Sequence, residues 1–168
     1  MVYFVEYDSP LGKLLLTCRE EGLTGIWFDK EPPEGLRQEH PILCQTVRWL
    51  DAYFRGEDPA VEMPLAPKGT TFQQQVWQIL LAIPYGQTRS YGSIAREIAC
   101  IQGKEKMSAQ AVGQAVGKNP ISILIPCHRC VGANGQMTGY AWGVEKKVWL
   151  LRHEGLTITD TIIQKTEE

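Results

Sequence analysis

A proline-rich segment at residues 57–69 separates two stretches of the chain that differ in character. Its three prolines favour an extended connection, because proline cannot donate a backbone hydrogen bond within a helix or a sheet. Short strand patterns precede this segment and short helix patterns follow it. A chain of 168 residues can form two small domains. We therefore predict an N-terminal domain over residues 1–67 and a C-terminal domain over residues 68–168.

Three strand patterns come before the first predicted helix. These patterns are largely apolar and lie at residues 2–7, 14–17 and 23–28. Turn signals separate them, which favours an antiparallel meander. Residues 43–54 then place apolar side chains at helical spacing, and Gly56 ends that pattern. The expected N-terminal domain is a small antiparallel sheet with one helix.

Three helix starts lie in the second half of the chain. Thr71 has a glutamine three residues later, which is the capping-box spacing. Ser90 and Ser108 are predicted to cap helices over about residues 91–99 and 109–116. Two short helices joined by a turn fit a helix-turn-helix, although a pair of packed core helices gives the same pattern. The predicted fold class is α+β, with a winged-helix-like C-terminal domain.

The segment 119–129 holds the most reactive group of side chains in the chain. Its apolar residues 121–125 indicate a short buried strand that Pro126 ends. Cys127 follows, next to His128 and an arginine, and nearby positive charge favours the thiolate, which is the nucleophilic form. On these residues alone, Cys127 can equally be a buried residue without chemistry.

The end of the chain is less patterned. Residues 131–143 contain several glycines and predict a hairpin or an active-site loop. Residues 144–153 predict a helix that ends before Gly155. Residues 156–168 show no periodic burial and are expected to form a frayed tail.

Charge is distributed unevenly along the chain. Residues 1–70 carry a formal charge of −5, and residues 71–155 carry +5. A basic module next to an acidic one suggests that the second half meets a polyanion, although +5 alone is a weak signal.

Several features indicate a cytoplasmic location. Five cysteines, an odd number without repeated spacing, argue against a disulfide framework and for a reducing compartment. No apolar run approaches the roughly 20 residues that cross a bilayer. The N-terminal residues are partly acidic and lack a basic stretch before an apolar one, so we expect no secretory signal.

Five pieces of the second half together carry a specific resemblance. The chain closely resembles the O6-alkylguanine-DNA alkyltransferases, also called methylated-DNA–protein-cysteine methyltransferases. The resemblance is carried by segments 119–129, 139–140, 149–151 and 153–155, together with Lys147. The pattern Pro-Cys-His-Arg followed by a helix that ends in His-Glu-Gly is highly specific for that family.

The resemblance covers about residues 71–155, whereas the N-terminal region fits only in length and in the order of its elements. It implies DNA repair by single-turnover transfer of an alkyl group from O6-alkylguanine, and also from O4-alkylthymine, to the protein's own cysteine. The implied partner is double-stranded DNA, and the implied protein is a monomer without cofactor or metal. A helix-turn-helix in the minor groove would flip the damaged base out of the duplex.

The resemblance also implies roles for particular residues. Cys127 would accept the alkyl group, and His128 would draw the thiol proton through a water molecule. Glu154 would orient the imidazole, Asn119 would fix the turn that carries the cysteine, and Arg129 would pair inward. The implied catalytic residues are Cys127, His128, Glu154, Asn119, Lys147, which lies near this relay, and Tyr91, which would donate to the leaving guanine.

A pocket for the extruded base and a surface for DNA are implied in the same way. The implied substrate-binding residues are Tyr140, Ala141, Trp142, Val116 and Cys130. The implied DNA-binding residues are Gln110, Ser90, Tyr91, Ala109, Ala111, Gly113, Lys104 and Lys106.

Three positions differ from the family pattern. Gln110 stands where the family has an arginine that fills the space of the flipped nucleotide, which puts the efficiency of flipping in doubt. Trp142 stands where many members have glycine, and an indole over the pocket should restrict bulky O6 substituents. Cys130 follows Arg129 where valine is frequent, and buried packing, a spare thiol and a redox pair with Cys127 remain open.

Two other classes of function are alternatives. The chain can be a non-catalytic module that binds alkylated DNA, although relatives of that kind replace the reactive cysteine. A metal site is the other alternative, built either from Cys127, His128 and Cys130 or, in the N-terminal domain, from Cys18, His40 and Cys44.

Overall fold

The computed structural model describes residues 1–34, 36–37, 39–137, 139–159 and 162–164. The chain forms two compact units. The N-terminal unit comprises Met1–Lys68 and Pro120–Leu124, and the C-terminal unit comprises Gly69–Asn119 and Ile125–Glu168. The predicted boundary between residues 67 and 68 stays a prediction, and the short segment 120–124 is a return of the chain to the first unit.

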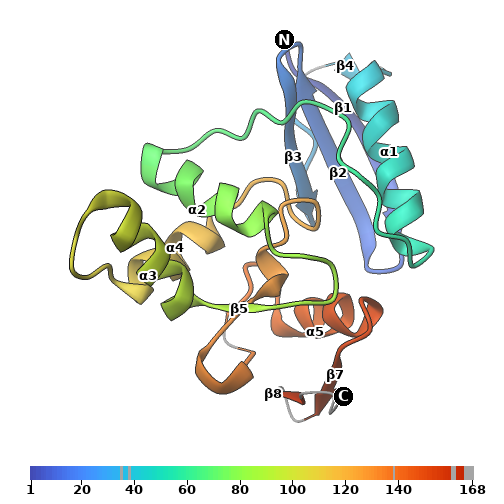
Figure 1. The fold of residues 1–168 in the computed structure, drawn as a ribbon. Coiled ribbons are helices and arrows are strands. Elements are labelled where there is room, and N and C mark those ends of the chain that lie inside the picture. The colour runs from blue at the N-terminus through green and yellow to red at the C-terminus, as the bar shows by residue number, and fades with distance from the viewer. Residues whose placement is uncertain (35, 38, 138, 160–161, 165–168) are drawn as a thin grey trace. The chain divides into compact units, whose positions relative to one another are not determined.

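The N-terminal unit is built on the predicted antiparallel meander. Strands β1 (Tyr3–Ser9), β2 (Gly12–Arg19) and β3 (Gly22–Phe28) pair in sequence, which confirms the expectation. A two-residue strand, β4 (Leu36–Arg37), adds to the free edge of β1 in parallel and was not predicted. The sheet order is therefore β3-β2-β1-β4 (Figure 1).

Helix α1 (Pro41–Phe54) packs along this sheet, as Figure 1 shows, and confirms the predicted helix. His40 caps it by accepting a hydrogen bond from the backbone N–H of Ile42. The helix buries one apolar face because its large side chains recur at helical spacing. Leu43, Leu50 and Tyr53 are fully or almost fully buried.

Two later segments hydrogen-bond to strand β3. The backbone of Leu23 pairs with the stretch around Leu65, and the backbone of Ile26 pairs with Ile121. The predicted strand over residues 121–125 is wrong, because only this isolated bridge forms and Ile123 has a positive φ of 71°. The apolar side chains of this segment are buried as expected, but the backbone forms a turn and not a strand.

The C-terminal unit begins with helix α2 (Thr71–Leu81). Its capping box uses Thr70 and Gln73, whose side chains each bond to the other residue's backbone N–H, at 3.1 and 2.9 Å. The prediction that Thr71 caps this helix is therefore wrong by one residue. Consecutive threonines are each followed three positions later by a glutamine, so the spacing alone does not choose between them.

The two helices of the predicted helix-turn-helix are present. Helix α3 (Tyr91–Gln102) is capped by Ser90, and helix α4 (Ala109–Gly117) is capped by Ser108, as predicted. Helix α3 runs three residues beyond the predicted end and stops at Gly103, which adopts the left-handed conformation. Helix α4 packs against both α2 and α3.

A compact arrangement of short elements follows in the same unit. A single 3₁₀ turn, η1 (Cys127–Arg129), leads into strand β6 (Cys130–Val131), which pairs in parallel with β5 (Arg89–Ser90). The glycine-containing segment is a loop with a second 3₁₀ turn, η2 (Ala133–Gly135), and not a hairpin. Helix α5 (Val144–His153) has the predicted bounds.

The predicted frayed tail is wrong for part of its length. Strands β7 (Thr157–Thr159) and β8 (Ile162–Gln164) form an antiparallel pair. Ile158 is buried in a cluster with Met137 and Leu151, so this hairpin supports the loop that precedes α5. Residues 160–161 and 165–168 of the predicted tail lie outside the described residues.

Candidate active site

A cavity of about 270 Å³ in the C-terminal unit brings together most of the predicted site residues. Its walls come from helices α3 and α4, the turn η1 and the loop before α5, which are far apart in sequence. Its lining residues are Tyr91, Gly113, Val116, Gly117, Asn119, Cys127, Gly139, Tyr140, Ala141 and Trp142.

Cys127 lines the cavity with only 6% of its surface exposed. The backbone N–H of Cys127 donates to Ile125 O at 2.8 Å, which closes a tight turn just before the 3₁₀ segment. Asn119 Nδ2 donates to the same carbonyl oxygen at 2.8 Å. The buried amide of Asn119 therefore ties down the turn that carries the cysteine, which is the position that the resemblance implies for it.

The thiol of Cys127 does not have the lowered pKa that the sequence suggested. Burial raises its pKa, whereas a hydrogen bond with Asn119 and the charge of Lys147 act in the opposite direction. The adjacent Arg129 points away from the sulfur, because its guanidinium binds Glu154 and the carbonyl oxygen of Ile83. The expectation of a resting thiolate is therefore wrong, and the thiol needs a base.

That base is available in a buried hydrogen-bonded group. His128 Nε2 lies 2.6 Å from Glu154 Oε2, and both side chains are fully buried. Arg129 donates to both carboxylate oxygens of Glu154, at 2.8 and 3.2 Å, and the backbone N–H of Gly86 donates to Oε1 at 3.0 Å. Sequence patterns gave no sign of the Gly86 contact, because it joins residues 68 positions apart.

The charges of this group are set by their surroundings. Burial raises the pKa of the Glu154 carboxyl, but the hydrogen bonds and charges of His128 and Arg129 outweigh it and lower the pKa to about 2. Burial lowers the pKa of the His128 imidazole, although Glu154 opposes this. At neutral pH the pair is thus a carboxylate beside a neutral imidazole.

A neutral imidazole that donates Nε2–H to Glu154 keeps its acceptor lone pair on Nδ1. Nδ1 of His128 is buried and has no hydrogen-bond partner among the described residues. The arrangement can therefore accept one proton on the side of the imidazole opposite to the carboxylate.

Lys147 is a buried cation in the same region. Its side chain is fully buried, so Lys147 is not a solvated charge on the surface of helix α5. Nζ donates to the backbone oxygens of Cys130 and Gly139, at 2.6 and 3.2 Å, and lies 5.8 Å from the centre of the Tyr91 ring. Burial lowers the pKa of Lys147, and its charge lowers the pKa of the Cys127 thiol.

Cys130 is the predicted substrate-binding residue that the structure does not bring to the cavity. It begins strand β6, is fully buried and does not line the cavity. Burial raises the pKa of its thiol to about 12, which keeps it protonated. Cys130 is therefore packed in the interior, and a redox pair with Cys127 stays a prediction.

The predicted DNA-binding residues fall on two adjoining surfaces of helices α3 and α4. The first, here called the α3–α4 groove, has a volume of about 670 Å³ and shares Tyr91 and Gly113 with the reactive cavity. Its lining residues are Ser90, Tyr91, Gly92, Arg96, Ala109, Gln110, Gly113, Gln114 and Ala133. Arg96, Gln114 and Ala133 were not predicted.

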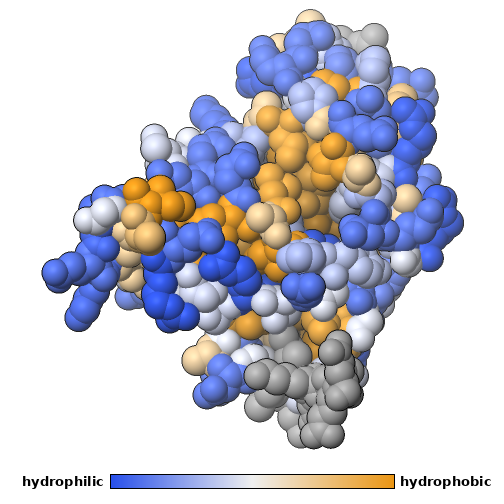
Figure 2. All heavy atoms as spheres, in the orientation of Figure 1, coloured by the Kyte–Doolittle hydropathy of each residue, from blue (hydrophilic) through white to orange (hydrophobic). Residues whose placement is uncertain are grey.

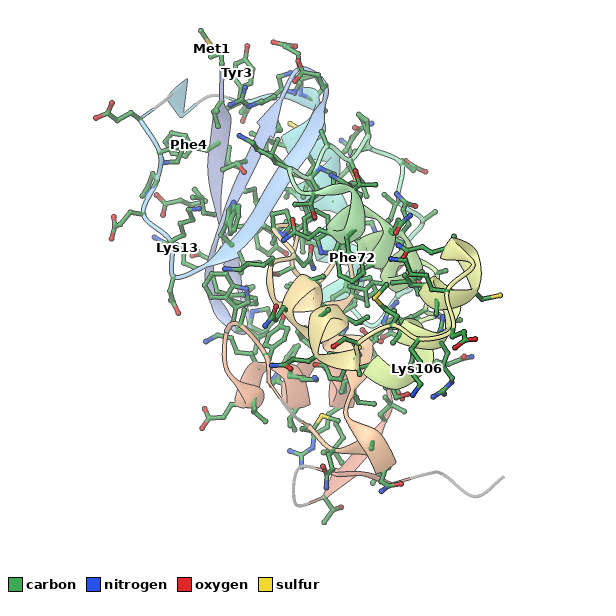
Figure 3. All side chains as sticks on the ribbon, turned by 90° about the vertical axis from the view of Figure 1, so that its left-hand side faces the viewer. Met1, Tyr3, Phe4, Lys13, Phe72 and Lys106 are labelled. Carbon is green, nitrogen blue, oxygen red and sulfur yellow. The ribbon has the colours of Figure 1, made fainter. Side chains whose placement is uncertain are left out.

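The second surface lies around the turn between α3 and α4 and contains Lys104 and Lys106. Both lysines are exposed, and Figure 3 labels Lys106 on the segment that leads into α4. Figure 2 shows the tip of this turn, at the left of the view, as hydrophilic. Ala111 lines neither surface, because it lies on a more buried side of α4.

The two predicted alternatives for a metal centre are not assembled. Among the described residues, no group of three or more His, Cys, Asp or Glu side chains is placed to hold a metal ion.

Both halves of the chain match models of known protein families. A family model described as "6-O-methylguanine DNA methyltransferase, DNA binding domain" matches residues 71–156. A second, described as "6-O-methylguanine DNA methyltransferase, ribonuclease-like domain", matches residues 2–67. The similarity thus extends over the N-terminal region, which had seemed to fit only in length and element order.

Individual relatives cover almost the whole chain. The methylated-DNA–protein-cysteine methyltransferase of Methanosarcina acetivorans is 45% identical over 159 residues, which are 92% of this chain and 99% of that protein. The corresponding protein of Mycobacterium leprae is 42% identical and covers 94% of this chain and 96% of its own length. The crystal structure of Mycobacterium tuberculosis OGT in complex with DNA has a TM-score of 0.79 at 40% identity, and covers 90% of this chain and 92% of that one.

Proposed function

The chain belongs to the methylated-DNA–protein-cysteine methyltransferase family, and we propose that it repairs DNA by moving an alkyl group from guanine O6 to its own Cys127. The observation that carries this proposal is the position of Cys127 in a cavity, next to the buried pair of His128 and Glu154. The partner is double-stranded DNA that contains O6-alkylguanine, and O4-alkylthymine is a second substrate.

The first step is activation of the thiol. The raised pKa of Cys127 means that its proton must leave as the substrate reacts, and the lone pair on His128 Nδ1 is the acceptor, reached through a water molecule. The imidazolium that forms is stabilised by the Glu154 carboxylate, which remains ionised because its pKa is about 2. The charge of Lys147 favours the developing thiolate.

The second step is displacement at the alkyl carbon. A sulfur–carbon bond forms as the carbon–O6 bond breaks, and the electron pair of that bond passes to guanine. The leaving base must gain a proton, and the Tyr91 hydroxyl, on the cavity wall, is the proposed donor. The thiol proton passes to His128 and the base takes the proton of Tyr91, so one proton must return from the imidazolium to the tyrosinate, through water, for the reaction to balance. The S-alkyl cysteine is a thioether and a poor leaving group, so each molecule reacts once.

The base must leave the helical stack to reach a cavity of this kind. Helices α3 and α4 supply the groove beside the cavity, and we propose that the groove follows the minor groove of the duplex while Tyr140, Ala141, Trp142 and Val116 surround the extruded base. Ser90, Ala109, Gln110 and Gly113 would contact the strand, and Lys104 and Lys106 would meet its phosphates.

We further propose that the protein acts as a monomer in the cytoplasm. No helix in the described parts of the chain has the length and the apolar character that crossing a bilayer requires. A reducing compartment keeps the reactive thiol available, because a thiolate or thiol nucleophile is lost on oxidation.

Intact-mass measurement after mixing with an O6-methylguanine duplex tests the proposal. We expect a gain of one methyl group per chain, no further gain with excess DNA, and no gain for Cys127→Ser. Cys130→Ser is the matched control and should still gain one. DNA binding by the wild type without any mass gain would favour the non-catalytic alternative and contradict the proposal.

A further inference from the structure

The α3–α4 groove has a single formal charge among its lining residues. That charge is Arg96, on the second turn of α3, and every other residue that lines the groove is neutral. The facing helix α4 presents Gln110 and Gln114, which are exposed and lie one helical turn apart. A polyanion that enters this groove therefore meets one cation and two amides.

The guanidinium of Arg96 is not used within the protein. Arg96 is exposed, and among the described residues it has no ion pair or hydrogen bond from its side chain. The nearby Arg89 differs, because its three guanidinium nitrogens bind Ser93 and Glu97 at 3.1 to 3.3 Å. Arg89 is held in place by internal partners, whereas the hydrogen-bond donors of Arg96 are available to a ligand.

The guanidinium also lies over a glycine on the wall of the groove. A Cβ atom at Gly92, one turn before Arg96, would lie 3.5 Å from Arg96 Nη1. The arginine therefore leans back along α3 towards its first turn, as helical side chains do, and so towards Tyr91 at the mouth of the reactive cavity. Because Gly92 has no side chain, nothing projects from this part of the groove wall beneath the guanidinium.

The groove and the cavity share a boundary. Tyr91 and Gly113 line both, and a Cβ at Gly113 would lie only 3.7 Å from the Tyr91 ring. A nucleotide whose base enters the cavity must leave its sugar and phosphates at this boundary, because the base is attached to them. The phosphate next to that nucleotide is then the anion nearest to Arg96.

We propose that Arg96 binds a backbone phosphate of the lesion-bearing strand beside the extruded nucleotide, and so supplies the charge that α4 lacks in this groove. A planar guanidinium binds a phosphate through two parallel hydrogen bonds, which fixes position as well as charge. Gln110 and Gln114 then contact neutral parts of the DNA. This inference rests on the proposed function, because it needs a base that is extruded into the cavity.

The test is the salt dependence of binding to an O6-methylguanine duplex, measured with Cys127→Ser as the background so that no transfer occurs. Loss of one phosphate contact should lower the slope of log affinity against log salt by about 1, and should weaken binding about tenfold at low salt. We expect both for Arg96→Ala, while Arg96→Lys should keep the slope and lose only part of the affinity. Arg55→Ala removes an exposed arginine of the N-terminal unit that pairs with Glu57, and should change neither.

Two results would overturn the proposal. The slope and affinity of Arg96→Ala could match the background protein, or Arg55→Ala could change both as much as Arg96→Ala does. An unchanged thermal unfolding midpoint for Arg96→Ala shows that any loss is not a loss of fold. Methyl transfer by the wild type is measured separately, so failure of the Arg96 proposal is distinguishable from failure of the proposed function.

Discussion

His128 and Glu154 share a buried hydrogen bond of 2.6 Å between Nε2 and Oε2, 26 positions apart in the chain. Three further donors, from Arg129 and Gly86, hold the same carboxylate. In the proposed mechanism this group lets a thiol whose pKa is raised by burial react, because a neutral imidazole held by the carboxylate takes its proton.

Replacement of Glu154 by glutamine should slow methyl transfer by about 10²-fold, because the imidazolium loses its carboxylate and the tautomer is no longer fixed. Single-turnover transfer from the methylated duplex measures this. Glu145→Gln, on the exposed first turn of the same helix, is the control and should react normally. Equal rates for the two variants would show that Glu154 does not orient the base.

Folding stability should fall in acid because of Glu154. Its pKa is about 2 in the folded protein against an ordinary value of 4.5. A lowered carboxyl pKa contributes stability that is fully present above about pH 4.5 and is lost as pH falls towards 2; the pKa difference corresponds to about 3 kcal/mol. Urea unfolding at several pH values measures the decline. A carboxyl carbon of Glu154 that titrates near 4.5 by NMR would contradict this assignment.

Removal of the buried charge at Lys147 should make the Cys127 thiol less acidic. Burial already raises the pKa of that thiol, and the Lys147 charge partly offsets the effect. Lys147→Met should therefore shift the pH profile of Cys127 alkylation by iodoacetamide to higher pH. Lys146→Met, at the preceding and less buried position, should leave the profile in place. A shift to lower pH in Lys147→Met would oppose the account.

Trp142 should limit the size of the O6 substituent. Its half-buried indole lines the reactive cavity, whose volume is about 270 Å³. Trp142→Gly should raise the rate with O6-benzylguanine relative to O6-methylguanine, because the substitution removes a large side chain from the wall. The ratio of the two rates in wild type and variant is the measurement. An unchanged ratio would mean that the indole does not face the substituent.

The parts of this fold that local patterns specify were predicted well. Ser90 and Ser108 are N-caps, and helix α5 has its predicted bounds, because caps, helical spacing and a terminal glycine are all local signals. The capping box of α2 was displaced by one residue only because the Thr-to-Gln spacing occurs twice.

The parts that depend on distant partners were not predictable in the same way. Ile121 pairs with Ile26, and Gly86 binds Glu154, at separations that periodicity does not report. The residues alone suggested that the charge of Arg129 acts on the sulfur, whereas the resemblance implied that Arg129 pairs inward, and its bonds to Glu154 and Ile83 confirm the second expectation. Most of the cavity residues were identified from the family resemblance, whereas Arg96 carries no motif and appeared only with the groove.

The most direct test of the central claim is to locate the transferred methyl group. Trypsin cuts after Lys118 and Arg129, so the peptide 119–129 contains Cys127 and excludes Cys130. After reaction with an O6-methylguanine duplex, tandem mass spectrometry should find one methyl group on the Cys127 sulfur. A methyl group on any other residue, or an unmodified 119–129 peptide from protein that has repaired the DNA, would contradict the account.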